Sequence, residues 1–382
     1  MKQLLPFLLT LSVLAGACKA TKKAYEQGDY ERAVINSVDR LRSNPDHRKS
    51  QETLSLAYPA MLEYFQDKVI QSRQSANPLR WEGIMEYYDI MNRAHDEIQR
   101  SPAARRVIPN PQNFASEYQD ARRNAAEARY LLGEDALGMA EDGDREAGKE
   151  AFTHFQKADA LIPGYRDAYS LTQYARDLAT LFVAIEPVPI HSQMLEMSNE
   201  YFQNQIIEYA SSVNFGEFVY LYPAGRNERR PADQILRMSF DDFVVGQAYV
   251  KETVRERSRD SVIIDEVQVT QDSVRPIYGT VKAESHVFKK QVTSTGLLDV
   301  RVIDARSGRV ISQRKFPGTH QWVDSWGFYT GDQRALNEDD KEAMRKKRES
   351  PVPAPQQLFI EFTRPIYGQV TNYLMDYYRR YR

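Results

Sequence analysis

The stretch "REAGKEAFTHFQKADALIPGYRDA", residues 145–168, combines strong helix formers with a definite end. Ala151 and Ala158 are seven residues apart, with Phe155 between them, so all three fall on one face of a helix. This spacing indicates two helices in close contact, because the small alanines let the backbones approach and Phe155 fills the remaining gap. Pro163 ends the helix, since its ring cannot continue one. The stretch therefore predicts closely packed α-helices.

Helix-forming residues extend over the N-terminal half, from about residue 22 to residue 179. A second, weaker unit is "AYEQGDYERAVINSVDRLRSNPDH", residues 24–47, where Ala33 takes the small contact position and Pro45 the end. Both units resemble the second helix of a tetratricopeptide repeat, which implies a helical array of the kind that binds proteins on a concave face. The separation of Ala33 and Ala151 is not a multiple of the repeat period, so we expect irregular helices or insertions.

Near residue 180 the pattern changes. "LFVAIEPVPI" (181–190) is an apolar run typical of a strand, and residues 193–213 read as a helix. The most regular hairpin is "TGLLDVRVIDARSGRVISQRKF" (295–316), with its turn at Ser307-Gly308. A strand, a helix and a hairpin in this order are typical of an α+β domain in which helices pack against one sheet. The sequence thus predicts a multidomain chain, with an all-α, tetratricopeptide-like domain over residues 18–179 and an α+β domain over residues 180–382.

The strand phrase "FVVG", matched at Val244–Gly246, and the hairpin at Leu298–Val310 carry a further resemblance. They are similar to the periplasmic domain shared by the curli secretion channel lipoprotein and the penicillin-binding-protein activator lipoproteins, which implies an α+β domain over about residues 181–316. The channel function does not follow, because a pore needs lipid-facing strands with an apolar outer face. The candidate "YVKETVRERSRDS" (249–261) is too charged.

Residues 1–17 have the three parts of a secretory signal: a basic start, an apolar centre and a small-residue end at Ala17. Cys18, the only cysteine, follows directly. This junction resembles the lipobox of bacterial lipoproteins, in which signal peptidase II cuts before a cysteine that is then acylated. The resemblance implies cleavage between Ala17 and Cys18 and lipidation of Cys18. The alternative is an ordinary cleaved signal with Cys18 as an incidental thiol.

Lys19 follows Cys18, where lipoproteins retained in the inner membrane of enteric bacteria carry Asp. The resemblance therefore implies an outer-membrane lipid anchor, and the lack of acidic residues in "CKATKK" (18–23) implies a periplasm-facing protein. The 51 basic and 53 acidic residues nearly cancel, so no global charge favours nucleic acid as a partner. The expected partners are the membrane, through the anchor, and one or more envelope proteins.

Two aromatic segments are candidate binding surfaces. Residues 81–98 place one aromatic and apolar stripe along a helix, which is either a ligand-binding face or core packing: Trp81, Ile84, Tyr88, Met91 and His95. The segment "FPGTHQWVDSWGFYTGD" (316–332) offers Trp322, Trp326 and Tyr329 as an exposed partner-binding loop, or as cover for the edge of the sheet. After it, residues 337–357 change from acidic to basic and end rich in proline, which predicts a mobile excursion with little to bury.

No catalytic signature is present. The sequence has no H-E-x-x-H, G-x-S-x-G or phosphate-loop motif, and its six histidines lack metal-ligand spacing. We therefore predict no catalytic residues, no metal and no cofactor. The expected function is that of a non-enzymatic lipoprotein that scaffolds or regulates a cell-envelope assembly. The alternatives are an envelope enzyme acting on cell-wall polymer and a subunit of a secretion assembly.

Overall fold

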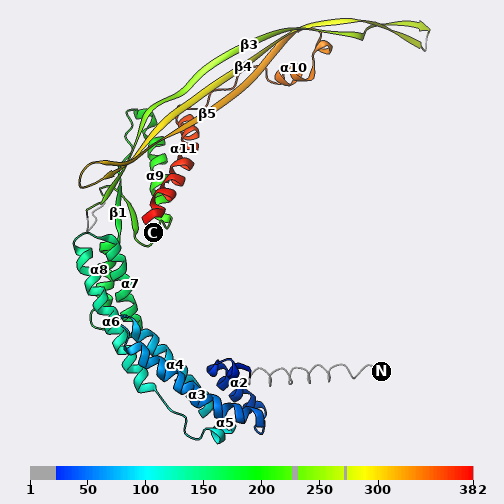
Figure 1. Ribbon diagram of the computed structural model, residues 1–382. Helices are drawn as coiled ribbons and strands as arrows, with labels where there is room; N and C mark the ends of the chain where they lie inside the picture. The colour runs from blue at the N-terminus through cyan, green and yellow to red at the C-terminus, as the bar shows by residue number, and fades with distance from the viewer. Residues whose placement is uncertain (1–22, 226–230, 271–272, 382) are drawn as a thin grey trace, which may run out of the picture. The chain divides into compact units, whose positions relative to one another are not determined.

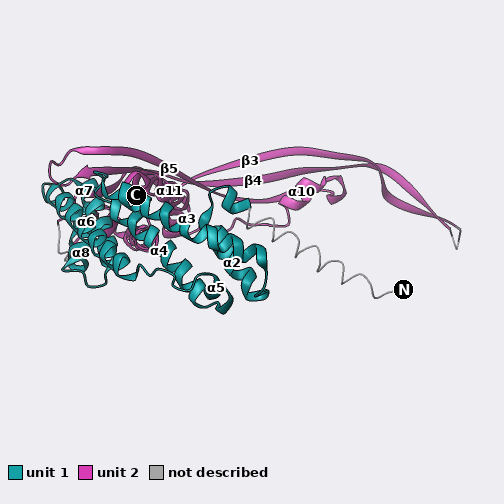
Figure 2. Ribbon diagram, turned by 60° about the horizontal axis from the view of Figure 1, so that its bottom comes forward, with its two compact units in different colours: residues 1–179 teal, residues 180–382 magenta. Residues whose placement is uncertain are grey.

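The computed structural model describes residues 23–225, 231–270 and 273–381 of the chain (Figure 1). Contacts within the chain divide it into two compact units, residues 1–179 and residues 180–382, which Figure 2 colours separately. We call them the helical unit and the sheet unit. The described part of the helical unit contains helices and no strand, whereas the sheet unit combines five strands with helices. The predicted order, an all-α region followed by an α+β region, is confirmed.

The described residues of the helical unit form a series of antiparallel and crossing helices joined by short turns. Asp144 starts one of them, because its carboxylate accepts hydrogen bonds from the backbone N–H groups of Glu146 at 2.9 Å and Ala147 at 3.2 Å. The helices are α2 (Tyr30–Ser43), α3 (Arg48–Arg73), α4 (Arg80–Gln99), α5 (Pro102–Val107), α6 (Ala115–Glu141), α7 (Arg145–Leu161) and α8 (Ala168–Ala179).

Small residues set the close approach of α6, α7 and α8. Gly133 of α6 lies under the ring of Phe155 in α7, and a Cβ atom at Gly133 would come within 2.7 Å of that ring. Gly148 of α7 faces the backbone of Ala179 in α8, where an added Cβ would lie 3.0 Å from the nitrogen. The packing of α7 against α6 and α8 therefore depends on glycines, which have no side chain, as much as on the ring of Phe155.

The sheet unit is built on one five-stranded sheet in the order β2-β1-β3-β4-β5. β1 pairs in parallel with β2 and β3, whereas β3, β4 and β5 are antiparallel. The strands are β1 (Leu181–Ile185), β2 (Val219–Pro223), β3 (Gln234–Thr270), β4 (Ser273–Asp304) and β5 (Val310–Gly331), and the main helices are α9 (Glu196–Ser212), α10 (Glu338–Ala343) and α11 (Pro355–Tyr378). Short 3-10 turns lie at Gln193–Leu195, Gln333–Ala335 and Arg379–Tyr381.

The predicted hairpin at residues 295–316 is confirmed, with β4 ending at Asp304 and β5 starting at Val310. The strand that precedes this hairpin in the chain is much longer, because β3 runs over 37 residues. The pairing of β3 with β4 shifts register near Gly246 and near Ser261. These two residues have positive φ angles of +79° and +59°. Such bulges bend a strand without ending its pairing.

The core of the sheet unit lies between the sheet and the helices α9 and α11, which run side by side (Figure 1). Two glycines of the sheet let α11 approach closely. A Cβ atom at Gly296 would come within 2.4 Å of the Phe362 ring, and one at Gly318 within 2.3 Å of the Phe362 carbonyl oxygen. The sheet backbone therefore touches a ring of α11 at Gly296 and the backbone of α11 at Gly318, which leaves no room for a side chain at either position.

Beyond the end of β5, strands β3 and β4 continue as a two-stranded ribbon, which we call the arm (residues 258–270 and 273–282; Figure 1). The last pair of the β4–β5 ladder joins Ala283 to Gly331. Large apolar side chains are exposed on the arm: Ile263, Ile264, Val267, Val269, Val274, Ile277 and Tyr278.

Residues 337–357 are mostly exposed or half-buried, and Asp340 is the one buried residue among them. Asp340 of α10 is 1% exposed and pairs with Arg257 of β3, and the Ser285 hydroxyl lies 3.4 Å from its carboxylate. The carbonyl of Lys346 accepts a hydrogen bond from the backbone of Gly327 in β5 at 3.1 Å. A buried carboxylate requires such partners, so the charged segment is held against the strands.

Within the described residues, no helix combines the length and the apolar character that a membrane span requires.

Candidate functional site: the Trp81 groove

Two adjoining pockets open on the helical unit, and both are lined by Trp81 and Asn124. Their volumes are ≈ 330 Å³ and ≈ 390 Å³. We call the combined depression the Trp81 groove. Its volume is in the range of pockets that hold a small ligand or a few side chains of a partner.

One face of α6 forms a long side of the groove. Its lining residues recur at intervals of three or four positions, which places them in a single stripe along the helix. From the start of α6 onward the stripe contains Glu117, Asp120, Ala121, Asn124, Glu127, Ala128, Leu131 and Asp135, and Arg123 and Leu132 line the groove beside it. The stripe is acidic at intervals and becomes apolar toward Leu131, which is 51% exposed.

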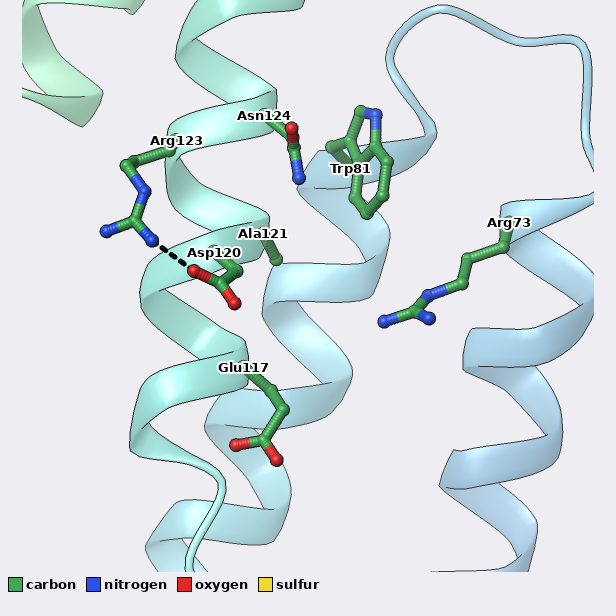
Figure 3. A pocket seen from close by; sticks show the side chains of 7 residues that line it. All are labelled: Arg73, Trp81, Glu117, Asp120, Ala121, Arg123 and Asn124. Carbon is green, nitrogen blue, oxygen red and sulfur yellow. Dashed lines mark hydrogen bonds and ion pairs between the residues drawn. The ribbon is translucent and has the colours of Figure 1, made fainter.

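The other side of the groove is basic and aromatic. In Figure 3, Arg73 extends from the end of α3 toward the face of α6 that carries Glu117 and Asp120. Arg73 also donates a hydrogen bond from Nη2 to the Tyr88 hydroxyl at 3.2 Å, which fixes its direction. On α6 itself, Asp120 forms an ion pair with Arg123 (Figure 3). The groove therefore presents both signs of charge within one depression.

Trp81 lies in the first turn of α4 and is partly exposed. The guanidinium of Arg80 lies 5.6 Å from the centre of its ring. The Nε–H of Arg80 is buried and has no acceptor among the described residues. An indole face beside a guanidinium suits an aromatic group of a partner.

A buried charge network fixes α4, α6 and α7 next to the groove. Arg129 of α6 donates to both carboxylate oxygens of Glu82, at 2.5 Å and 2.9 Å, and to Nδ1 of His154 at 3.1 Å. The hydrogen bond from Arg129 lowers the pKa of Glu82. Burial, and then the charge of Arg129, lowers the pKa of His154. A guanidinium only donates, so Nδ1 must accept and the imidazole is held neutral.

A second network lies at the far end of the groove. Glu127 accepts hydrogen bonds from the Tyr165 hydroxyl and from Arg166, the latter at 2.7 Å. The guanidinium of Arg166 lies 4.8 Å from the centre of the Tyr130 ring. The hydroxyl of Tyr130 donates to Asp167 at 2.5 Å, and this bond raises the pKa of Tyr130 to about 12. The turn after α7 is thereby attached to α6 at Glu127, which also lines the groove.

The predicted repeat residues pack the helical unit and do not line the groove. Four of them are buried at 0% exposure: Ala33, Ala151, Phe155 and Ala158. Pro45 and Pro163 each follow a helix by one residue beyond its cap, after α2 and α7 respectively. Ala17 and Cys18 lie outside the described residues.

The stripe predicted over residues 81–98 separates into two roles. Ile84, Tyr88 and Met91 are buried in the core of the helical unit, whereas Trp81 lines the groove. Sequence reasoning missed the α6 side of the groove. The helical spacing of Glu117, Asp120, Glu127 and Asp135 could have indicated an acidic stripe on α6. No sequence pattern indicated that α3 and α4 would face this stripe.

Trp322, Trp326 and Tyr329 lie in strand β5, so their interpretation as a loop is wrong. Trp326 stacks on Phe288 of β4 with ring centres 5.5 Å apart, and Trp322 lies opposite Val292. Tyr329 is an odd number of residues from both tryptophans and therefore projects from the other face of the sheet. The structure does not bring these three residues together as one site.

The Trp81 groove combines charged, amide, aromatic and apolar side chains. Its described lining residues include guanidinium, carboxylate, amide and indole groups, and none is Ser, Thr, Cys or His. In the part of the chain that the structure describes, no group of three or more His, Cys, Asp or Glu side chains is placed to hold a metal ion.

No protein-family profile and no curated protein sequence matches this chain. Among solved structures, a crystal structure of a homolog of the neuraminyllactose-binding hemagglutinin, from Helicobacter pylori, aligns with 53% of this chain and 92% of its own length. The aligned residues are 11% identical and the TM-score is 0.24. A similarity at this level defines neither the fold nor the function of this chain.

Proposed function

We propose that this chain is a non-enzymatic lipoprotein, anchored to the outer membrane through Cys18 and facing the periplasm, that scaffolds or regulates a cell-envelope assembly. The support for the anchor is the signal-like segment that ends at the only cysteine. The observation that carries the binding role is the Trp81 groove, an open depression with paired charges and an aromatic wall.

In this proposal the helical unit is an irregular tetratricopeptide-like array. The contact of Phe155 with Gly133 supports it, because an aromatic ring over a small residue is the packing expected between the two helices of such a repeat. α3 and α6, at 26 and 27 residues, act as the irregular helices that break the period.

The groove favours a protein segment as its ligand. Acidic groups on α6 alternate with the basic groups Arg73, Arg80 and Arg123, so a partner segment with both signs of charge meets an opposite charge at several points. An aromatic or aliphatic side chain of that segment packs between Trp81 and Leu131. Aromatic anchors of this kind contribute most of the binding energy at protein interfaces.

A photo-crosslinking experiment in intact cells tests the binding role. A benzophenone amino acid at Asn124, which borders both pockets, is expected to form an adduct with an envelope protein, and Trp81→Ala is expected to reduce that adduct at least about tenfold. The matched control places the same group at Tyr169 of α8, which is 68% exposed and outside the groove. The same adduct at both positions, or none at Asn124, contradicts the proposal.

The anchor is tested separately. Cys18→Ala is expected to leave the chain uncleaved or to release it from the membrane fraction, because acyl chains attached to Cys18 are its membrane attachment in this proposal.

A further inference from the structure

A row of five aromatic rings crosses the start of the helical unit. It begins at Tyr25 and continues through Tyr30 of α2, Tyr64 and Phe65 of α3, and Tyr87 of α4. Successive ring centres lie 5.7, 5.8, 5.2 and 5.9 Å apart. Rings at these distances attract one another edge to face or in tilted pairs, so the row is one continuous surface feature. We call it the aromatic row.

Every ring of the aromatic row is half-buried or exposed. Tyr64 is 43% exposed, and the other four have intermediate exposure while packing against the buried core of the unit. One side of such a ring packs against the core of the helical unit, and its other side is accessible to solvent or to a binding partner. Four of the five carry a hydroxyl, and tyrosine is enriched where an apolar layer meets water, as at the headgroup level of a membrane.

The charges around the aromatic row are mixed. The ammonium of Lys68 lies 5.4 Å from the centre of the Tyr64 ring, and Arg93 pairs with Glu31 at 3.1 Å. Lys23 and Glu26, beside Tyr25, are both exposed and opposite in sign. These groups sum to one positive charge, which is too few to attract anionic lipid strongly, so any contact with a bilayer must rest on the rings.

The position of the row in the chain identifies its partner. Tyr25 is seven positions after Cys18, and a fully extended chain covers at most about 25 Å over seven steps. A lipid attached at Cys18 therefore keeps the aromatic row within reach of the headgroup layer at all times. A tethered surface acts at a high effective concentration, so weak contacts become populated.

We propose that the aromatic row is a membrane-docking surface, which lies in the headgroup layer of the bilayer that holds the acyl chains of Cys18. The proposal rests on the lipid anchor of the proposed function. Docking through the rings fixes the orientation of the helical unit on the membrane, which a flexible lipid tether alone does not do.

The test uses the mature, acylated protein in vesicles of phosphatidylcholine, with or without bromine on the acyl chains. Tyr64→Trp adds an indole to the row while keeping a large aromatic ring. Bromine quenches indole emission on contact, so we expect the emission added by this substitution to fall at least about twofold in brominated vesicles. High salt should leave the effect unchanged, because screening weakens charge contacts and not the burial of rings. The matched control is Tyr169→Trp on α8, whose added emission is expected to be the same in both kinds of vesicle.

Flotation of the same samples separates the two proposals. If the protein floats with the vesicles and the emission added at position 64 is not quenched, or is quenched no more than that at position 169, the anchor stands and the docking surface is refuted. If the protein does not float, the anchor is refuted and this proposal with it. If the emission added at position 64 changes with protein concentration in the absence of lipid, the row binds a second copy of the chain, which also overturns the proposal.

Discussion

The ion pair between Arg257 and Asp340 attaches α10 to the long strands, and the structure indicates what its loss costs. Arg257 donates to both carboxylate oxygens of Asp340, at 2.5 Å and 3.1 Å. These hydrogen bonds lower the pKa of Asp340, which therefore stays ionised although it is 1% exposed. The substitution Arg257→Met leaves this charge buried without a partner. Such a loss costs about 3–5 kcal/mol in buried pairs, and we take about 3 kcal/mol because the Arg257 side chain is 24% exposed.

We expect Arg257→Met to favour local opening of α10. The rate at which a buried thiol is modified measures this opening. Ala283 is 6% exposed and belongs to the small apolar cluster that also contains Met344. A protein that carries Cys18→Ser and Ala283→Cys has a single thiol, and a thiol reagent modifies it only when this cover opens. When closing is faster than modification, the rate follows the equilibrium population of the open form. A change of about 3 kcal/mol then accelerates labelling by about 100-fold.

If the cost of Arg257→Met comes from an unpaired buried charge, a second substitution that removes the charge should reverse it. A general loss of contacts would not be reversed in this way. Adding Asp340→Asn to Arg257→Met removes the unpaired charge, so labelling of the double variant should slow again to within about tenfold of the parent. The matched control is Arg255→Met, two residues before Arg257 in β3, where the arginine is exposed and its replacement should leave the rate within about twofold. A double variant that is labelled as fast as Arg257→Met refutes the assignment of the cost to a buried charge.

Three further substitutions test the packing and the charge network. Gly318→Ala should lower the free energy of unfolding by about 3 kcal/mol in urea, because its Cβ atom would lie 2.3 Å from a backbone oxygen of α11. Gly133→Ala should destabilise the helical unit by about 1 kcal/mol, since a clash with Phe155 at 2.7 Å outweighs the gain in helix propensity, whereas Gly138→Ala in the same helix meets nothing within 4 Å and should stabilise it by about 1 kcal/mol. The pKa of His154 is lowered from 6.5 on folding, so the unfolded chain takes up the proton first and stability falls as pH drops through 6.5. His154→Gln should flatten this part of the stability–pH curve measured by urea unfolding; an unchanged slope contradicts the assignment.

Local patterns predicted the features that depend on neighbouring residues. The hairpin at 295–316 follows from alternation around Ser307-Gly308, and the carboxylate of Asp304 caps the turn by accepting from the backbone and hydroxyl of Ser307, both at 2.7 Å. The helical half follows from its composition. For both the hairpin and the helices, the residues that determine the structure lie close together in the sequence.

Features that depend on distant residues were not predictable. The segment after residue 337 reads as solvated charge, because the partner that buries Asp340 lies 83 residues away in sequence. Gly318 and Gly327 belong to the segment that was interpreted as a loop, yet they lie within β5. A Cβ atom at either position would meet neighbouring backbone, at 2.3 Å from Phe362 and 2.7 Å from His286. Glycine in a strand thus marked close approach and not a turn.

The Trp81 groove illustrates the same limit for a site. Its α6 stripe follows from helical spacing, but the groove exists only because α3 and α4 are placed against that stripe by packing. The buried contact of Arg129 with Glu82 joins residues 47 positions apart. No single-sequence pattern encodes such a pairing.

The arm has a consequence for how chains behave at high concentration. A two-stranded ribbon with exposed valines and isoleucines is the kind of segment that seeds fibrils, because both of its edges offer backbone groups to another strand. Pro276 of β4 has no N–H to offer, and β3 is interrupted by register shifts on both sides of Ser261–Ile263. An incoming strand therefore finds no long, regular edge to extend. The arm can expose apolar side chains to a partner without turning a crowded population of identical chains into amyloid.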